Sequence, residues 1–219
     1  MKRLVVLGLA VLLAGCSKEA VYNGKTVTQW RQTLQEPSPQ ARQEAAAALA
    51  EIGPRAKAAV PDLASALKDR DQGVRIKAAF ALWCMGTEAR DAIPDLLDAL
   101  KDKNAEVRLN AAGALGALGT EARYAVLPLG ETLKDGDPLV REAAAKALQG
   151  LGREARDAVP ALTATLKDKN KSVRIAVAYA LAEIGPDAQP AIPALKEMAR
   201  DKDGAVHGAA SHALGKIQG

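Results

Sequence analysis

Apolar residues recur along most of this chain at the spacing of amphipathic helices, and the whole pattern returns every 33 residues. Three residues recur together with this period: a glycine, a leucine, and an arginine that histidine replaces in the last unit. They are Gly53, Gly86, Gly119, Gly152 and Gly185; Leu49, Leu82, Leu115, Leu148, Leu181 and Leu214; Arg42, Arg75, Arg108, Arg141, Arg174 and His207. Such a period over six units predicts a repeat architecture, which we place at residues 23–219.

Each unit is predicted to hold two antiparallel helices. In the third unit, Ile93, Leu96 and Leu100 form the apolar face of a first helix, and Pro94 suits its first turn. A second helix then begins in every unit after a residue whose side chain can cap a free backbone N–H, and it ends at the repeated glycine in a left-handed turn. These N-cap residues are Ser38, Asp71, Asn104, Asp137, Asn170 and Asp203.

One helix pair cannot bury its own apolar face, whereas stacked pairs can, so the pattern predicts an all-α solenoid of six two-helix repeats. The 33-residue period is shared with ankyrin repeats, but the TPLH signature of those repeats is absent, as are the Trp, Gly and Tyr positions of tetratricopeptide repeats. The recurring LKD, VR, AA, AL and G elements resemble HEAT-like repeats of the short, phycobilisome-lyase type. The resemblance covers about nine tenths of the chain.

Three units depart from the pattern. Trp30 stands where the other units have leucine, and terminal repeats are usually atypical because they cap the stack, so Trp30 is interpreted as part of a capping core. In the fourth unit the proline of the first helix is Pro128, one place late, and we expect that helix to be slightly offset. The sixth unit replaces the repeated arginine by His207, which fits a softened outer surface at the end of the stack.

The repeated Asp and Arg residues are interpreted as structural, because the resemblance implies an Asp–Arg ladder between neighbouring units and because an active site needs only one copy. The Asp series is Asp69, Asp102, Asp135, Asp168 and Asp201. His207 and His212 lie five residues apart and do not share the i, i+4 spacing of a helical metal site. No catalytic motif, metal site or cofactor is predicted, and we expect the protein not to be an enzyme.

The N-terminus carries the features of an export signal. Lys2 and Arg3 precede the apolar run Leu4 to Ala14, which is too short to span a bilayer. The following LAGC resembles the lipobox of bacterial lipoproteins. The resemblance implies a signal peptide over residues 1–15, lipid attachment at Cys16, and a short linker over 16–22. Ser17 in place of Asp favours the outer membrane, if the host has one.

Removal of the signal changes the charge only slightly, leaving 28 basic residues against 26 acidic ones. This balance gives no reason to expect nucleic-acid binding. Only Cys84 remains besides Cys16, so no internal disulfide is predicted.

Function in a solenoid usually lies at positions that the repeat does not dictate. In the second helices these positions face away from the core stripe, and the resemblance places them on a concave face. The candidate partner-binding residues are Ile76, Phe80, Trp83, Leu109, Glu142, Lys146, Ile175 and Tyr179. Gly113 and Gly116 lie among them, where glycine costs about 1 kcal/mol relative to alanine. Either Trp83 leans across these glycines from the neighbouring unit, or a partner packs on them.

The sequence therefore predicts a membrane-anchored scaffold of the cell envelope that binds a protein or peptide on its concave face. The alternative is a HEAT-like lyase or hydrolase that acts in the same groove. A third possibility is a structural lipoprotein without a dedicated ligand.

Overall fold

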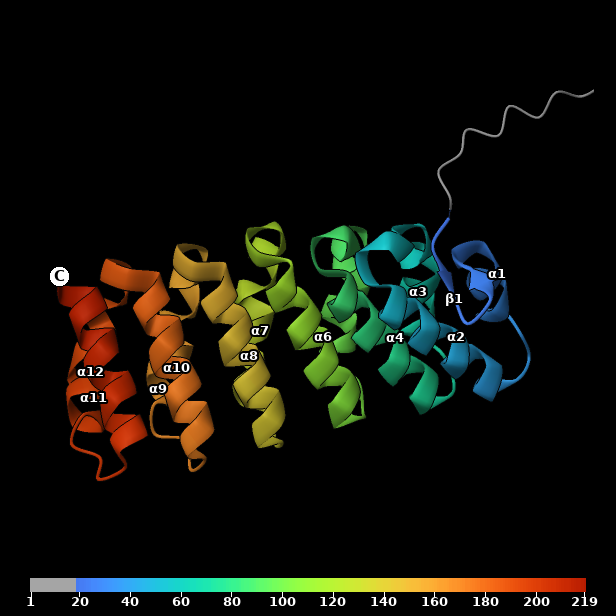
Figure 1. The fold of residues 1–219 in the computed structure, drawn as a ribbon. Coiled ribbons are helices and arrows are strands. Elements are labelled where there is room, and N and C mark those ends of the chain that lie inside the picture. The colour runs from blue at the N-terminus through green and yellow to red at the C-terminus, as the bar shows by residue number, and fades with distance from the viewer. Residues whose placement is uncertain (1–18) are drawn as a thin grey trace, which may run out of the picture.

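In the computed structural model, which describes residues 19–219, six helical units stack side by side in the order of the sequence (Figure 1). Each unit contributes one short and one long α-helix, so the stack has two layers. The expected all-α solenoid is confirmed. A two-stranded antiparallel hairpin, Val21–Tyr22 (β1) with Lys25–Thr26 (β2), precedes the first helix.

The long helices form one layer and pack on one another in sequence order. They are α2 (Pro39–Ile52), α4 (Gln72–Met85), α6 (Ala105–Ala117), α8 (Pro138–Leu151), α10 (Lys171–Ile184) and α12 (Gly204–Gln218). Every one has the predicted N-cap, with Pro39 and Pro138 at the first helical position of α2 and α8.

The short helices form the second layer. They are α1 (Val27–Thr33), α3 (Val60–Ala66), α5 (Ile93–Ala99), α7 (Val126–Thr132), α9 (Val159–Thr165) and α11 (Ile192–Met198). Each from α3 onward follows a seven-residue 3₁₀ segment that sequence analysis did not predict: η1 (Gly53–Ala59), η2 (Gly86–Ala92), η3 (Gly119–Ala125), η4 (Gly152–Ala158) and η5 (Gly185–Ala191).

The repeated glycine makes the turn from a long helix into a 3₁₀ segment. Its φ is positive in all five copies, as predicted, from 54° at Gly152 to 73° at Gly185. At Gly86, φ 58° combines with ψ −132°, the mirror image of extended backbone. A side chain would make this conformation strained, so the glycine is required by the backbone.

The expected offset of the first helix in the fourth unit is wrong. α7 begins at Val126, in register with Ile93 and Val159 of the neighbouring units. Pro128 is the third residue of α7, where a helix has no carbonyl partner for the backbone N–H. The displaced proline therefore costs no hydrogen bond and does not shift the helix.

Small residues set the distance between the long helices. One position is alanine in all six units, as the sequence shows, and every copy is buried: Ala48, Ala81, Ala114, Ala147, Ala180 and Ala213. Leucines of both layers fill the space between them, for example Leu63 and Leu82, which are fully buried. The core thus runs through the whole stack without interruption.

The N-terminal end of the stack is closed by Trp30, which is buried as predicted. Its indole Nε1 donates to the carbonyl of Tyr22 at 3.1 Å, and Lys25 lies over the ring at 4.3 Å from its centre. Val21 and Tyr22, which sequence analysis counts with the linker, form the first strand. The predicted signal peptide and Cys16 lie outside the described residues.

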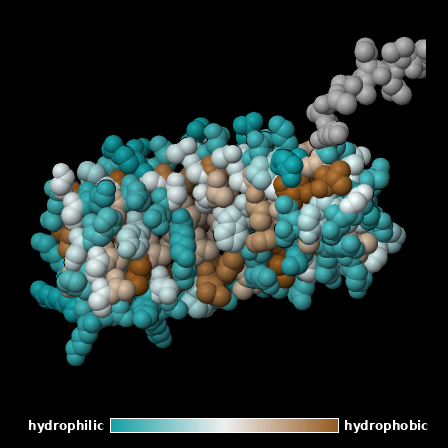
Figure 2. Space-filling model, viewed as in Figure 1, coloured by the Kyte–Doolittle hydropathy of each residue, from teal (hydrophilic) through white to brown (hydrophobic). Residues whose placement is uncertain are grey.

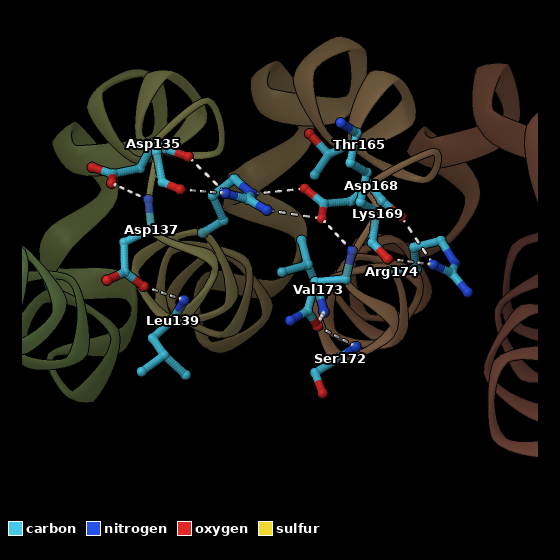
Figure 3. A network of polar contacts seen from close by, with 12 residues as sticks. Asp135, Asp137, Leu139, Thr165, Asp168, Lys169, Ser172, Val173 and Arg174 are labelled. Atoms are coloured by element: carbon cyan, nitrogen blue, oxygen red, sulfur yellow. Dashed lines mark hydrogen bonds and ion pairs between the residues drawn. The ribbon is translucent and has the colours of Figure 1, made fainter.

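The Asp–Arg ladder joins each unit to the next along the edge where the short helices turn into the long ones. Its pairs are Arg42–Asp69, Arg75–Asp102, Arg108–Asp135, Arg141–Asp168 and Arg174–Asp201. Most are bidentate: Arg108 donates from Nε at 2.7 Å and from Nη2 at 2.8 Å to the two oxygens of Asp135. Figure 3 shows the middle of this ladder, with Asp135 and Asp168 on neighbouring units.

Each ladder aspartate also holds its own turn. Asp168 accepts from the backbone N–H of Asn170 at 2.8 Å, and the guanidinium of Arg174 donates to the carbonyl of Asp168 at 2.9 Å. One carboxylate thus fixes both the turn and the contact between units. This explains why the residue repeats and supports its structural interpretation.

Candidate binding surface

The exposed sides of the six long helices form one continuous surface, here called the long-helix face. Figure 1 views this face with α4, α6, α8, α10 and α12 in front. Figure 2 shows brown and pale side chains in its middle, over α6 and α8, and a second brown patch at the N-terminal end of the stack. One apolar part of the surface therefore lies at the centre of the stack.

All eight candidate residues lie on the long-helix face, exposed or half-buried. On α4, Phe80 and Trp83 are about 40% exposed, which is high for aromatic side chains of a folded domain. Their rings meet edge to face with centres 6.2 Å apart. Ile76, one turn before Phe80, is half-buried and packs against the core. The three residues form an apolar ridge along α4.

The glycines of α6 are explained by packing within the protein. A Cβ placed on Gly113 would lie 2.8 Å from Cδ2 of Trp83, so the indole rests directly on the Gly113 backbone. Of the two alternatives for Gly113, the contact with Trp83 is therefore correct. At Gly116 a Cβ would lie 2.9 Å from the Cα of Ala147, because α6 and α8 approach each other closely there.

An apolar groove of about 370 Å³ opens between α4, α6 and α8. Its wall on the α4 side is Trp83, and its floor is formed by Gly113, Gly116, Ala143 and Ala147. The residues that line it are Trp83, Leu109, Gly113, Gly116, Ala117, Leu139, Glu142, Ala143, Lys146 and Ala147. The floor has no large side chains, because α6 and α8 contribute only glycine and alanine to it.

Four of the predicted residues, Trp83, Leu109, Glu142 and Lys146, meet in this groove. Sequence analysis missed Leu139, which is 59% exposed at the first turn of α8. The sequence contained the signal: the equivalent position is polar or small in the other five units, from Gln40 to Ala205. Only the fourth unit places a large apolar residue there.

The polar side of the groove is one ion pair. Lys146 and Glu142, four residues apart on α8, bind each other, and the lysine is far more exposed than the glutamate. Glu142 is thus held against the helix surface while Lys146 extends over it. The pair gives an otherwise apolar groove one negative and one positive group.

Ile175 and Tyr179 do not take part in the groove. They lie one helix further along the stack, on α10, where the ring of Tyr179 contacts that of His212 on α12 with centres 5.6 Å apart. The predicted surface therefore has two aromatic ends, at α4 and at α10, separated by the groove.

The described residues offer little catalytic chemistry. Within residues 19–219, no three His, Cys, Asp or Glu side chains come together as metal ligands would. Burial, together with the negative charge of Glu51, raises the pKa of the Cys84 thiol, which disfavours the reactive thiolate. In the same part of the chain, no helix combines the length and the apolar character needed to cross a membrane.

Comparison with known families identifies the repeat. The model of HEAT repeats matches residues 27–89, 60–128 and 126–215, which together span most of the chain. No curated protein sequence matches the chain.

Solved structures share the fold over most of their length. An engineered protein is 28% identical, covers 87% of this chain and 96% of its own, and superposes with a TM-score of 0.74. A designed armadillo repeat protein in complex with the peptide (KR)4 is 20% identical. The match covers 88% of this chain and 100% of that one, with a TM-score of 0.75.

A natural protein is also similar. The structure of the complex of CpcE and CpcF of phycocyanin lyase from Nostoc sp. PCC7120 matches with 26% identity, coverage of 91% of this chain and 80% of that one, and a TM-score of 0.63. This similarity agrees with the repeat type expected from the sequence.

Proposed function

The chain belongs to the HEAT-repeat family, and we propose that it is a scaffold whose long-helix face binds a protein or peptide partner. The observation that carries this proposal is the groove at the centre of that face, with Trp83 as one wall and glycine and alanine as its floor. Solenoids bind partners on such extended surfaces, where the residues are free of the repeat pattern.

The composition of the face supports a macromolecular partner. Exposed aromatic side chains contribute much of the binding energy at protein interfaces, because they bury a large area with few rotatable bonds. Here Phe80 and Trp83 stand beside an open apolar groove rather than inside a closed cavity. One ion pair, Glu142–Lys146, adds a polar group that can orient a partner.

The alternative of a lyase or hydrolase is suggested by the similarity to the phycocyanin lyase subunit structure. Chemistry in the groove would need a free acid, base or nucleophile. The two ionisable side chains that line it, Glu142 and Lys146, bind each other. We therefore favour the scaffold over the enzyme.

We further propose that the scaffold is anchored in the cell envelope through lipid on Cys16, with the outer membrane favoured if the host has one. The support is the sequence LAGC after a short apolar run. Acyl chains give stable anchoring when more than one is attached. Cys16→Ala should release the protein from membranes, and unchanged membrane retention would refute the anchor.

The scaffold is tested by crosslinking capture of partners from membranes of the host. Phe80→Ala with Trp83→Ala is compared with the wild-type chain. The matched control is Tyr124→Ala with Leu127→Ala, which removes an aromatic and an aliphatic side chain, 72% and 66% exposed, from the short-helix layer. Loss of a partner in the first variant and its retention in the control would support the long-helix face. Equal recovery in all three proteins would overturn the proposal.

A further inference from the structure

We propose that the partner bound by the long-helix face is a second copy of this chain, packed face to face around a two-fold axis that runs along the stack. The inference rests on the proposed function, because it uses the same face, and it identifies the partner. A two-fold contact pairs a surface with itself, so it requires that the surface be complementary to its own rotated image.

The complementarity lies in two positions four residues apart on each of the four central long helices, α4, α6, α8 and α10. A two-fold axis along the stack reverses the direction of every helix and keeps the order of the units. Each helix then faces its own copy antiparallel, and the first position of one meets the second position of the other. The pairs are Ile76 and Phe80 on α4, Leu109 and Gly113 on α6, Glu142 and Lys146 on α8, and Ile175 and Tyr179 on α10.

At α8 the charges match. Glu142 of one copy meets Lys146 of the other, and the reverse contact occurs on the opposite side of the axis. The side chain of Lys146 is 62% exposed, so its ammonium can reach a carboxylate of the second copy while it remains near its own Glu142. The parallel arrangement of the same helices would place Glu142 against Glu142, which like charges disfavour.

At α6 the contact is apolar. Leu109 is a half-buried side chain that lines the groove, and the indole of Trp83 covers Gly113 one turn later. In the antiparallel arrangement, Leu109 of each copy lies over the Trp83 ring that rests on Gly113 of the other. On the two outer helices of these four an isoleucine meets an aromatic ring, Phe80 on α4 or Tyr179 on α10. Such aliphatic–aromatic contacts bury a large apolar area.

The size of the face agrees with a stable dimer. A 14-residue helix is about 21 Å long, and four helices spaced about 9 Å apart span about 36 Å. Their product is about 750 Å² per copy, or about 1,500 Å² in total, within the range of specific protein–protein interfaces. The apolar side chains over α6 and α8 seen in Figure 2 agree with the apolar core of such interfaces.

The test uses charge reversal on the full chain, purified in mild detergent and fused at its C-terminus to one of two fluorescent proteins. Energy transfer between the two labels measures the dissociation constant. Glu142→Lys alone places four lysines around the axis, and Lys146→Glu alone places four glutamates there. Each variant should bind itself at least about tenfold more weakly than the wild-type chain binds itself. Mixed together, the two variants should bind each other nearly as well as the wild-type copies do.

The controls are Glu131→Lys and Lys134→Glu, which reverse the members of a more exposed ion pair at the end of α7, in the short-helix layer. They should leave the dissociation constant unchanged, because they lie outside the long-helix face. Association through the N-terminal segment or the detergent would be the same in all samples and would not separate the two sets of variants. Absence of energy transfer between wild-type copies, or no recovery in the mixture of variants, would overturn the dimer. If the Phe80→Ala and Trp83→Ala chain still loses a captured partner in that case, the scaffold stands and only the identity of its partner is wrong.

Discussion

The indole of Trp83 on α4 lies on the backbone of Gly113 on α6, so closely that a Cβ at Gly113 would stand 2.8 Å from the ring. This contact joins the second and third units on the exposed side of the stack. It also keeps Trp83 against the protein, as the wall of the groove. The glycine is therefore what allows an exposed tryptophan to have a fixed position.

Gly113→Ala should displace the Trp83 ring. Alanine is favoured over glycine in a helix by about 1 kcal/mol, but the new methyl group occupies the place of the indole. We expect little net change in the free energy of unfolding, together with a change in tryptophan emission. Fluorescence and urea unfolding measure the two effects. The other tryptophan, Trp30, is buried far from the substitution and should keep its emission.

The control for this substitution is Gly208→Ala in α12. Nothing lies within 4 Å of a Cβ at Gly208, so the helix gains the preference for alanine without a clash. This variant should be more stable by about 0.5–1 kcal/mol with unchanged emission. If both alanine variants gained the same stability and neither altered the fluorescence, the contact between Trp83 and Gly113 would be wrong.

Gly116→Ala should destabilise the protein, in contrast to Gly113→Ala. Its Cβ would meet the Cα of Ala147 at 2.9 Å, and backbone cannot rotate away as a side chain can. α6 and α8 must separate, which we expect to cost about 1–3 kcal/mol, as overpacking usually does. Urea unfolding at neutral pH measures the loss. A variant as stable as the wild type would show that the two helices are further apart than described.

Most of the fold could be predicted from the sequence, because a repeat presents the same evidence several times. The N-cap residues and the positive φ at the repeated glycine were both predicted, and the structure confirms them. The 3₁₀ segments were missed, since a stretch such as Gly86–Ala92 has too few apolar residues to indicate its geometry. The expected offset at Pro128 failed because a proline within the first helical turn loses no hydrogen bond.

The site was predictable only in part. Positions that vary from one repeat unit to the next identified the long-helix face, but a sequence does not give the orientation of a side chain on it. The contact between Trp83 and Gly113 depends on that direction, and so does the separation of Tyr179 from the groove. Leu139 could have been found by comparing its position in all six units, without any structure.

Removal of one ladder carboxylate should cost more in the middle of the stack than at its end. Asp102 binds Arg75 through both oxygens, and the arginine side chain is only 6% exposed. Asp102→Ala leaves that buried guanidinium without its counter-charge, at a cost of about 2–4 kcal/mol. Asp201→Ala breaks a single, more exposed contact with Arg174 and should cost about 1 kcal/mol. Equal losses in urea unfolding would contradict the role of burial in the ladder.

The ladder should also make the protein sensitive to acid. The hydrogen bond from Arg42 lowers the pKa of Asp69. At Asp102, burial acts to raise the pKa, but the bonds from Arg75 and from the Asn104 amide outweigh it and lower the pKa overall. The same balance, with burial opposed by an arginine and a backbone amide, lowers the pKa of Asp135 and Asp168.

The direction of the effect follows from linkage. An aspartate in the unfolded chain has a pKa of about 3.9, above the folded values, so the folded protein binds fewer protons. The stabilisation is complete above about pH 5 and declines as the pH falls through about 4 and then through the lowered pKa values. The urea midpoint should therefore be constant from pH 7 to 5 and drop steadily toward pH 3. Asp102→Asn, which removes one titrating group, should show a smaller drop from its own neutral midpoint. A midpoint that rose or stayed level down to pH 3 would show that these carboxylates do not titrate with folding.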